Sequence, residues 1–252
     1  MSTLEELAHT PRLLVALDVD GTLAPLLDRP MEVRLAPEAR AAVLKLVALP
    51  DTTVALVSGR TLHDLRIISE HDTWPLPLAG SHGAEFWFPD EGEAGGANDA
   101  DESAQRDVLR TRAEGLVEPL RGVWIEPKTF GFAVHTRKAS DADSVAANAV
   151  VDDLVADQAP QWRRRDGRDV VEYASRTEGK DTAVQVLRER TGATGVLFAG
   201  DDITDEDALG SLGSGDLGVL VGDRDSHATV KVPDIAAMAA LLDELGRLRA
   251  NR

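Results

Sequence analysis

"ALDVDGTLAPL", residues 16–26, begins inside an apolar run and then places two carboxylates, Asp18 and Asp20, one residue apart before Gly21. The apolar run, residues 12–18, has the length and character of a buried strand. Residues two apart in extended backbone point to the same side, so we expect both carboxylates to project together from the end of this strand. Gly21 allows the chain to turn sharply away from it. Two acids so placed indicate a chemical site.

The composition limits the class of protein and the kind of metal site. The chain has 252 residues, 43% of them hydrophobic, which allows a sizeable core in one large domain or two smaller ones. It has no cysteine, so disulfides and thiolate metal sites are excluded. The formal charge of −17 disfavours nucleic-acid binding. The most basic stretch, "WRRRDGR" at 162–168, is predicted to be the solvated edge of a sheet.

The sequence favours a cytoplasmic protein without a membrane partner. The first apolar run follows acidic residues and is shorter than a signal peptide requires, and no later run approaches the roughly 18 apolar residues of a membrane span. We therefore expect a small-molecule partner, with no nucleic acid and no membrane. No coiled-coil heptad suggests more than a monomer.

Strand and helix patterns alternate near both ends of the chain, which is typical of a parallel sheet with crossover helices. The predicted strands are 12–18, 52–59, 195–200 and 216–222, and the predicted helices are 37–50, 61–69, 180–190, a short one opened by Thr204, and one from Pro233. Residues 89–104 are acidic and glycine-rich, which predicts a mobile loop and a domain boundary.

The middle of the chain has a different order of elements. A helix at about 104–120 is followed by strands 122–128 and 131–137, a helix opened by Ser140, and strands 161–165 and 168–173 joined by an Asp166-Gly167 turn. The predicted fold is therefore α/β. A Rossmann-like parallel-sheet core, residues 1–103 and 176–252, carries an inserted small α+β cap domain with an open-faced sheet, residues 104–175.

Polar groups follow three predicted core strands, in the segments 18–22, 58–60 and 200–205. Ligands bind beyond the carboxyl ends of strands in open parallel sheets, and if these strands are neighbours, several carboxylates meet Ser58 and Arg60 there. Such a cluster of acids is costly unless a cation compensates it. Oxygen ligands with room for water fit Mg²⁺ better than Zn²⁺ or an all-protein Ca²⁺ cage.

A carboxylate beside Mg²⁺ can attack phosphorus, because the metal reduces the repulsion between the two anions. We predict that Asp18 is this nucleophile. Asp20, on the same side of the chain, can protonate the departing alkoxide and then deprotonate the water that hydrolyses the aspartyl-phosphate. The segment around Asp18 therefore predicts a phosphate-transfer reaction.

The motifs resemble those of the haloacid dehalogenase superfamily of phosphatases. They are D-x-D-G-T at 18–22, the strand-terminal Ser58, Lys180 at the start of a helix, and G-D-D-x-T-D at 200–205. The resemblance implies that Ser58 hydrogen-bonds the phosphoryl oxygens and that Lys180 neutralises them. It further implies a Mg²⁺ site formed by Asp18, the backbone carbonyl of Asp20, and Asp201, with support from Asp205 and Asp202.

A narrower resemblance is to the trehalose-6-phosphate phosphatase family. It is carried by "SGR" at 58–60, "GSHGAE" at 80–85, "EPK" and "HTR" within 126–137, and "GDDITDE" at 200–206. It implies hydrolysis of trehalose 6-phosphate to trehalose and phosphate in trehalose biosynthesis. The third motif departs from the family's Lys-Gly-x-Ala, because Asp181 follows Lys180.

Alternation along the predicted cap strands points to the sugar. Ala133, His135 and Arg137 share one face of their strand, and Trp124, Glu126 and Lys128 share one face of theirs. Charged groups beside an aromatic ring suit a ligand with vicinal hydroxyls. With the family resemblance, the candidate substrate-binding residues are Gly21, Thr22, Arg60, His82, Gly83, Glu126, Lys128, His135, Arg137, Glu172 and Asp202.

Several alternatives stay open from sequence alone. The same machinery could act on another sugar phosphate, such as glucosylglycerate, mannosylglycerate or sucrose phosphate, or could serve a phosphomutase. A catalytically silent, regulatory domain that binds sugar phosphate is a different class of function. The pair Asp18 and Asp20 argues against it, because a silent domain has no need of the second acid.

Overall fold

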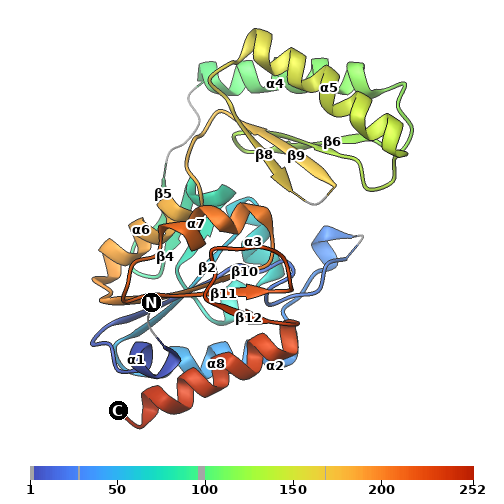
Figure 1. Cartoon of the computed structure of the whole chain (residues 1–252). Coiled ribbons are helices and arrows are strands. Elements are labelled where there is room, and N and C mark those ends of the chain that lie inside the picture. Colours follow the sequence, from blue (N-terminus) through green and yellow to red (C-terminus); the bar gives the residue numbers. More distant parts are fainter. Residues whose placement is uncertain (1–2, 28, 96–99, 168) are drawn as a thin grey trace. The chain divides into compact units, whose positions relative to one another are not determined.

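The structure is a computed structural model that describes residues 3–27, 29–95, 100–167 and 169–252 (Figure 1). The chain divides into two compact units. The unit called the core here comprises Met1–Gly95 and Glu178–Arg252, and the unit called the cap comprises Gly96–Thr177. The predicted cap segment, 104–175, falls inside the second unit.

An eight-stranded sheet forms the centre of the core. Its spatial order is β12 (Val230–Val232), β11 (Leu217–Val221), β10 (Gly195–Gly200), β1 (Leu13–Leu17), β2 (Thr52–Val57), β3 (Leu78–Gly80), β4 (Glu85–Phe88) and β5 (Gly92–Gly95). All neighbouring pairs from β12 to β3 are parallel, and only β4 and β5 add antiparallel pairs at one edge. The predicted parallel-sheet core is confirmed.

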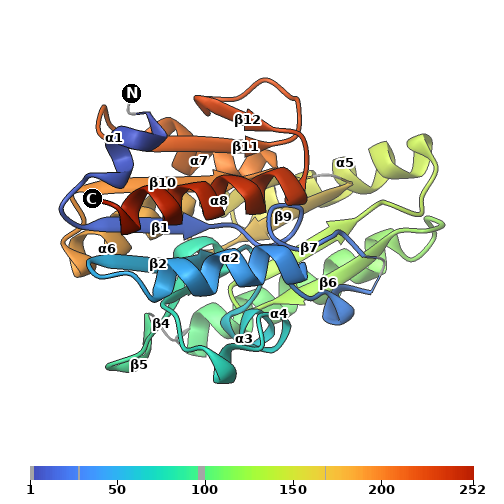
Figure 2. The same ribbon diagram turned by 90° about the horizontal axis from the view of Figure 1, so that it is seen from below.

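Helices cover both faces of this sheet. One face carries α1 (Leu4–Ala8), α2 (Pro37–Val47), α3 (Leu62–Ile68) and α8 (Ile235–Ala250), and the other carries α6 (Lys180–Thr191) and α7 (Glu206–Ser211). Short 3₁₀ turns lie at Pro30–Glu32, His71–Thr73, Ser81–Gly83 and Ile203–Asp205. Figure 2 shows α2 and α8 lying side by side on one face of the sheet, roughly along its strands.

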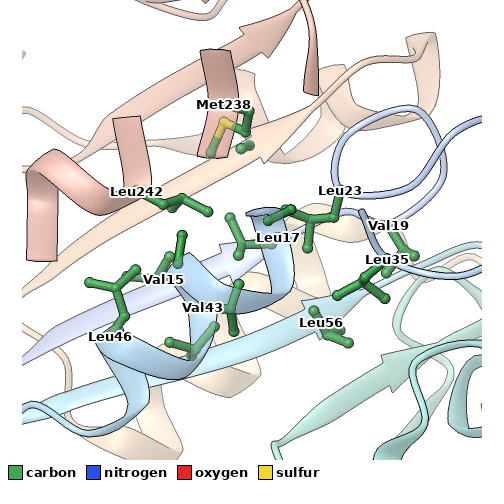
Figure 3. Close-up of a cluster of buried hydrophobic side chains, with 14 of the residues drawn as sticks. Val15, Leu17, Val19, Leu23, Leu35, Val43, Leu46, Leu56, Met238 and Leu242 are labelled. Atoms are coloured by element: carbon green, nitrogen blue, oxygen red, sulfur yellow. The ribbon is translucent and has the colours of Figure 1, made fainter. Parts of the chain in front are cut away.

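Strand β1 is apolar at every position because both of its faces are buried. Val15 and Leu17 pack in the cluster with α2 and α8, where Val43 and Leu242 lie close to them (Figure 3). Leu14, at the alternate parity, belongs to the second cluster, on the side of α6 and α7. The sheet is therefore the middle of three layers.

The cap contains a four-stranded antiparallel sheet with helices on one face. Its spatial order is β6 (Trp124–Lys128), β7 (Gly131–His135), β9 (Val170–Ala174) and β8 (Arg163–Gly167), and its helices are α4 (Ala100–Val117) and α5 (Asp141–Gln158). Phe132, Val134 and Tyr173 pack against residues of both helices. The predicted open-faced α+β cap is confirmed, and Ser140 caps α5 as predicted.

Three local predictions were wrong, one at the edge of the core sheet and two in the cap. Residues 92–95 form an edge strand rather than loop, because backbone hydrogen bonds to β4 need no apolar side chain, and α4 begins at Ala100. Residues 89–91 of the predicted loop form a turn, and 96–99 lie outside the described residues. The predicted turn at Asp166-Gly167 is also wrong, because both residues pair with β9. Strand β8 continues through Gly167, and Asp169 lies in a turn with a φ of 57°; residue 168 lies outside the described residues. β8 is an edge strand, as predicted.

The remaining differences concern how elements begin and end. The predicted strand 131–137 ends at His135, where its pairing with β9 ends. The cap of the turn before α7 is Asp202 and not Thr204, because Asp202 and Asp205 form a reciprocal capping box one turn earlier. Strand β12 and helix α1 were not predicted.

Among the described helices, none has the length and apolar character required to cross a membrane.

Candidate active site

The three polar strand ends predicted from sequence are brought together by the order of the sheet. β1 lies between β10 and β2, and Leu17 is in register with Ala199 on one side and Leu56 on the other. Asp18, Ser58 and Asp201 therefore follow the carboxyl ends of three adjacent parallel strands. This is the edge at which open α/β sheets bind ligands.

Lys180 joins two of the carboxylates. Its Nζ atom lies 2.7 Å from Asp18 Oδ1 and 2.6 Å from Asp205 Oδ1, and all three side chains are buried. Although burial opposes it, the two carboxylates raise the pKa of Lys180, so its ammonium group stays charged. Lys180 is the first residue of α6, which places its side chain at the sheet edge.

Asp18, Asp201 and Asp205 form a cluster in which one carboxylate oxygen of each residue lies within 4.8 Å of the other two. Burial raises the pKa of Asp18, with Lys180 opposing the rise, and burial with the nearby Asp205 raises the pKa of Asp201 to about 7. One lysine cannot balance three acids. An all-oxygen donor set with excess negative charge fits a hard divalent cation, which would favour the ionised forms.

Two residues of the first motif lie against the carboxylates of this cluster. Thr22 Oγ1 donates to Asp18 Oδ2 at 3.2 Å and lies 3.5 Å from Asp201 Oδ1. Gly21 has φ +82°, and a Cβ atom there would lie 2.1 Å from Asp201 Oδ2. The predicted sharp turn at Gly21 is present, and it also makes room for the acid of the neighbouring strand.

Asp20 is held by Arg60 rather than by the lysine. Arg60 Nε and Nη2 donate to Asp20 Oδ2 and Oδ1 at 2.6 and 2.7 Å, which is a bidentate ion pair. Such pairs fix the plane of a carboxylate as well as its position. Arg60 was predicted to contact substrate, and in this structure its guanidinium orients the second acid of the D-x-D pair.

Ser58 and His82 meet at a strained turn. Ser81, His82 and Gly83 all have positive φ, at 47°, 56° and 103°. The turn is held by hydrogen bonds from Ser81 N to Arg60 O at 2.6 Å and from His82 N to Ser58 O at 3.0 Å. The His82 ring covers the peptide of the second motif, where a Cβ atom at residue 59 would lie 2.6 Å from it. Strain of this kind is typical of functional sites.

The cap sheet has one polar face, on the side away from α4 and α5. The strand register places Trp124 opposite His135, and it aligns Glu126 with Ala133, the neighbour of Glu172. Glu126 Oε2 lies 2.6 Å from His135 Nε2, and its Oε1 accepts from Lys128 Nζ at 2.9 Å. Burial alone would raise the pKa of Glu126, but these two partners lower it to about 2.

Two predicted site residues have different surroundings from the rest. Arg137 lies in an exposed turn beyond the end of β7. Strand alternation therefore does not assign its side chain to the same face as His135. The Asp202 side chain accepts a hydrogen bond from Ile203 N at 2.7 Å as a helix cap. That these two residues contact a substrate stays a prediction.

The sequence analysis missed two arginines beside the candidate groups. Arg165 is buried on the polar face of the cap, paired in register with Glu172. Alternation along β8 could have placed it there if the strand had been predicted to continue through Gly167. Arg224 donates to the carbonyl oxygen of Asp201 at 3.1 Å. Backbone contacts of this kind leave no motif in a sequence.

A family model and several curated relatives match most of this chain. Residues 16–232 match the family model described as trehalose-phosphatase. A trehalose-phosphate phosphatase of Mycobacterium tuberculosis is 35% identical over 250 residues, covering 92% of this chain and 61% of the relative. An uncharacterized glycosyl hydrolase of the same species is 34% identical over 265 residues, covering 97% of this chain and 19% of the relative. The chain thus spans only part of the length of these relatives.

A solved structure shares the fold over nearly the whole chain. The C-terminal domain of a trehalose-6-phosphate phosphatase from Candida albicans superposes with a TM-score of 0.83 at 19% identity. The match covers 97% of this chain and 95% of that domain. At this level of identity the likeness concerns the fold alone.

Proposed function

The chain belongs to the trehalose-phosphatase family, and on this premise we propose that it hydrolyses trehalose 6-phosphate to trehalose and phosphate, as a step of trehalose biosynthesis. The observation that carries the proposal is the buried contact of Lys180 with Asp18 and Asp205, next to Asp201. A nucleophilic carboxylate, a fixed cation and two further acids at one sheet edge are what phosphate transfer through an aspartyl-phosphate requires.

The donor set fits Mg²⁺, which Asp18, Asp201 and the backbone carbonyl of Asp20 would hold, with Asp205 in support. Bound there, Mg²⁺ would supply positive charge to the phosphate ester. In the proposed first step, an oxygen of Asp18 attacks phosphorus and the bond from phosphorus to the sugar oxygen breaks. Lys180 lowers the repulsion between the two anions.

Asp20 is the proposed acid and base. Protonated, it gives its proton to the departing sugar oxygen, and as a carboxylate it then takes a proton from the water that attacks the aspartyl-phosphate. Phosphate leaves and Asp18 is restored. Arg60 orients the Asp20 carboxylate through two hydrogen bonds, which suits the second step, where Asp20 acts as the base. Ser58, buried at the end of β2, is proposed to bind phosphoryl oxygens.

The polar face of the cap sheet is proposed to bind the sugar. Glu126, Lys128 and His135 form one hydrogen-bonded group, with the Trp124 ring stacked on the imidazole at 4.6 Å. Such a group offers acceptors and donors for vicinal hydroxyls beside an apolar surface. Glu172 supplies a further carboxylate from β9 on the same face. A cytoplasmic location and a monomeric state stay predictions from the sequence.

A phosphate-release screen tests the proposal. The substrates are trehalose 6-phosphate, sucrose phosphate, and glucosylglycerate and mannosylglycerate phosphates, each with and without Mg²⁺. Asp18→Asn is the test variant, and Asp243→Asn, an exposed acid on α8, is the matched control. We expect Mg²⁺-dependent release from trehalose 6-phosphate by the wild type and the control, and none by Asp18→Asn.

The screen also separates the alternatives. Release from another sugar phosphate alone keeps the reaction and replaces the substrate. An isomeric sugar phosphate without free phosphate indicates a mutase. No product from any substrate, or equal release by Asp18→Asn, contradicts the enzymatic proposal and favours a silent binding domain.

A further inference from the structure

An arginine outside the recognised motifs holds the backbone of the acidic loop that follows β10. Arg224 lies in the loop after the neighbouring strand β11. Its Nε donates to the carbonyl oxygen of Asp201 at 3.1 Å, and its Nη2 donates to the carbonyl oxygen of Asp202. One guanidinium therefore spans two successive peptide units, a use that suits its rigid, forked geometry.

Arg224 is itself fixed from the other side. Its Nη1 forms an ion pair with Glu206 Oε1 at 2.6 Å. The second oxygen of Glu206 accepts hydrogen bonds from the backbone N and Nδ1 of His227, at 2.8 and 2.9 Å. The backbone carbonyl of Arg224 accepts from Lys231 Nζ, on β12, at 2.6 Å. The guanidinium is thus anchored to α7 and, through its main chain, to the edge of the sheet.

The backbone N–H groups of the same two residues, Asp201 and Asp202, are held by an acid of the cluster. Asp205 Oδ2 accepts hydrogen bonds from the backbone N of Asp201 and of Asp202, at 3.0 and 2.9 Å. With Arg224 on the carbonyl side, donors and acceptors of this short segment are both fixed. The segment carries the Asp201 carboxylate, which reaches the cluster with Asp18.

We propose that Arg224 is a positioning residue for the metal site: it fixes the main chain from which the Asp201 carboxylate projects. The inference rests on the proposed function only in assuming that a divalent cation binds at Asp18 and Asp201, with Asp205 in support. Groups that orient ligands without touching the metal typically contribute about 10- to 100-fold in metal affinity when they are removed. Arg224 has the contacts of such a group, through the backbone rather than through the ligand's side chain.

Binding of Mn²⁺ to the full chain, without substrate, tests this. Free Mn²⁺ is measured by electron paramagnetic resonance, and Mg²⁺ competition shows that both ions share the site. We expect Arg224→Met to weaken Mn²⁺ binding about 10- to 100-fold. Arg224→Lys is expected to recover part of the loss. Its ammonium group can reach one of the two carbonyl oxygens, but it cannot contact both of them and Glu206 at the same time. Glu206→Gln weakens binding in the same direction by loosening the anchor of the arginine.

Arg188→Met is the matched control. Arg188 forms a bidentate pair with Asp216 at 2.8 and 3.0 Å, and Asp216 lies before β11, at the amino-terminal ends of the same strands. This control is expected to lower the melting temperature without changing Mn²⁺ affinity. Wild-type affinity in folded Arg224→Met, or an equal loss in Arg188→Met, overturns the inference. If Arg224→Met does not fold, wild-type affinity in Glu206→Gln overturns it.

The assay is independent of the reaction. If the wild type does not bind Mn²⁺, the proposed metal site is contradicted. The role of Arg224 is then contradicted too, whatever the phosphate-release assay shows. If Mn²⁺ affinity depends on Arg224 but no sugar phosphate is hydrolysed, the inference stands and the proposed function fails.

Discussion

The Nζ atom of Lys180 lies 2.7 Å from Oδ1 of Asp18, with the lysine side chain 3% exposed and the aspartate side chain 6% exposed. Residues so buried are seldom charged unless they are paired. Here the lysine serves two acids at once, because Asp205 Oδ1 is 2.6 Å away and fully buried. The contact therefore links the stability of the core to the chemistry of its site.

Replacing Lys180 by Met is expected to destabilise the metal-free protein. The change leaves the carboxylates of Asp18 and Asp205 buried without their cation, and breaking a buried pair in this way typically costs about 3–5 kcal/mol. Urea unfolding in the presence of EDTA measures the loss. Lys45→Met, which breaks an exposed pair with Asp243, is the control and is expected to change the free energy of unfolding by less than about 1 kcal/mol. Equal losses in the two variants would contradict this account of the cluster.

Replacing Asp201 by Asn is expected to remove the response of the protein to Mg²⁺. A ligand at 100 times its dissociation constant adds about 2.7 kcal/mol to the free energy of unfolding, so Mg²⁺ raises the melting temperature of the wild type. Asp201→Asn loses this gain, because the variant lacks one of the three clustered carboxylates. Without Mg²⁺ it is at least as stable as the wild type, since one of several like charges is gone. A melting curve that Mg²⁺ still shifts in Asp201→Asn would place the metal elsewhere.

Much of the core and its site could be predicted because the signals are local. An apolar run that ends in Asp18 has to be a strand buried on both faces, and an acid directly after such a strand has to lie at the sheet edge. Two further strands that end in Ser58 and Asp201 follow the same rule. Adjacency of the three strands was the one assumption, and the sheet order confirms it.

The features that could not be predicted depend on pairing between distant segments. The Asp166-Gly167 dipeptide predicts a turn, but in the structure both residues pair with β9. The register between β8 and β9, and not the dipeptide, therefore decides where strand β8 ends. Asp202 and Thr204 are both suitable caps with an acid three residues later, so the sequence offers two registers and the structure uses the first. Arg224 contacts carbonyl oxygens, which every residue has, so no spacing of side chains indicates its role.

Changes on the polar face of the cap are expected to affect the sugar substrate alone. Glu126→Gln or His135→Ala removes a hydrogen-bonding group worth about 1–3 kcal/mol, which corresponds to a roughly 5- to 150-fold rise in KM for trehalose 6-phosphate. Hydrolysis of 4-nitrophenyl phosphate, which has no sugar hydroxyls, is expected to stay unchanged. Steady-state kinetics with both substrates measure the difference.

The control for this prediction is Val145→Ala, on the helical side of the cap. Val145 is 70% exposed, so its loss leaves the polar face of the cap sheet intact. It is expected to change neither KM. If Glu126→Gln and His135→Ala reduce hydrolysis of both substrates equally, the cap face does not select the sugar.

The buried His71 is expected to make the core less stable in mild acid. The residue is 2% exposed, its Nε2 donates to Leu76 O at 2.9 Å, and its ring lies edge-on against that of Trp87. Burial lowers the pKa of His71 from its ordinary value of 6.5, so the unfolded chain binds a proton more readily than the folded one. The free energy of unfolding therefore falls as pH drops through 6.5 toward the lower folded value.

Urea unfolding between pH 7.5 and pH 5 measures this effect. His71→Gln keeps a donor for Leu76 but does not titrate, so its free energy of unfolding should depend less on pH than that of the wild type. The exposed His63, replaced by Gln, is the control and should leave the wild-type slope unchanged, whereas equal slopes in His71→Gln and wild type would mean that His71 does not carry the acid sensitivity.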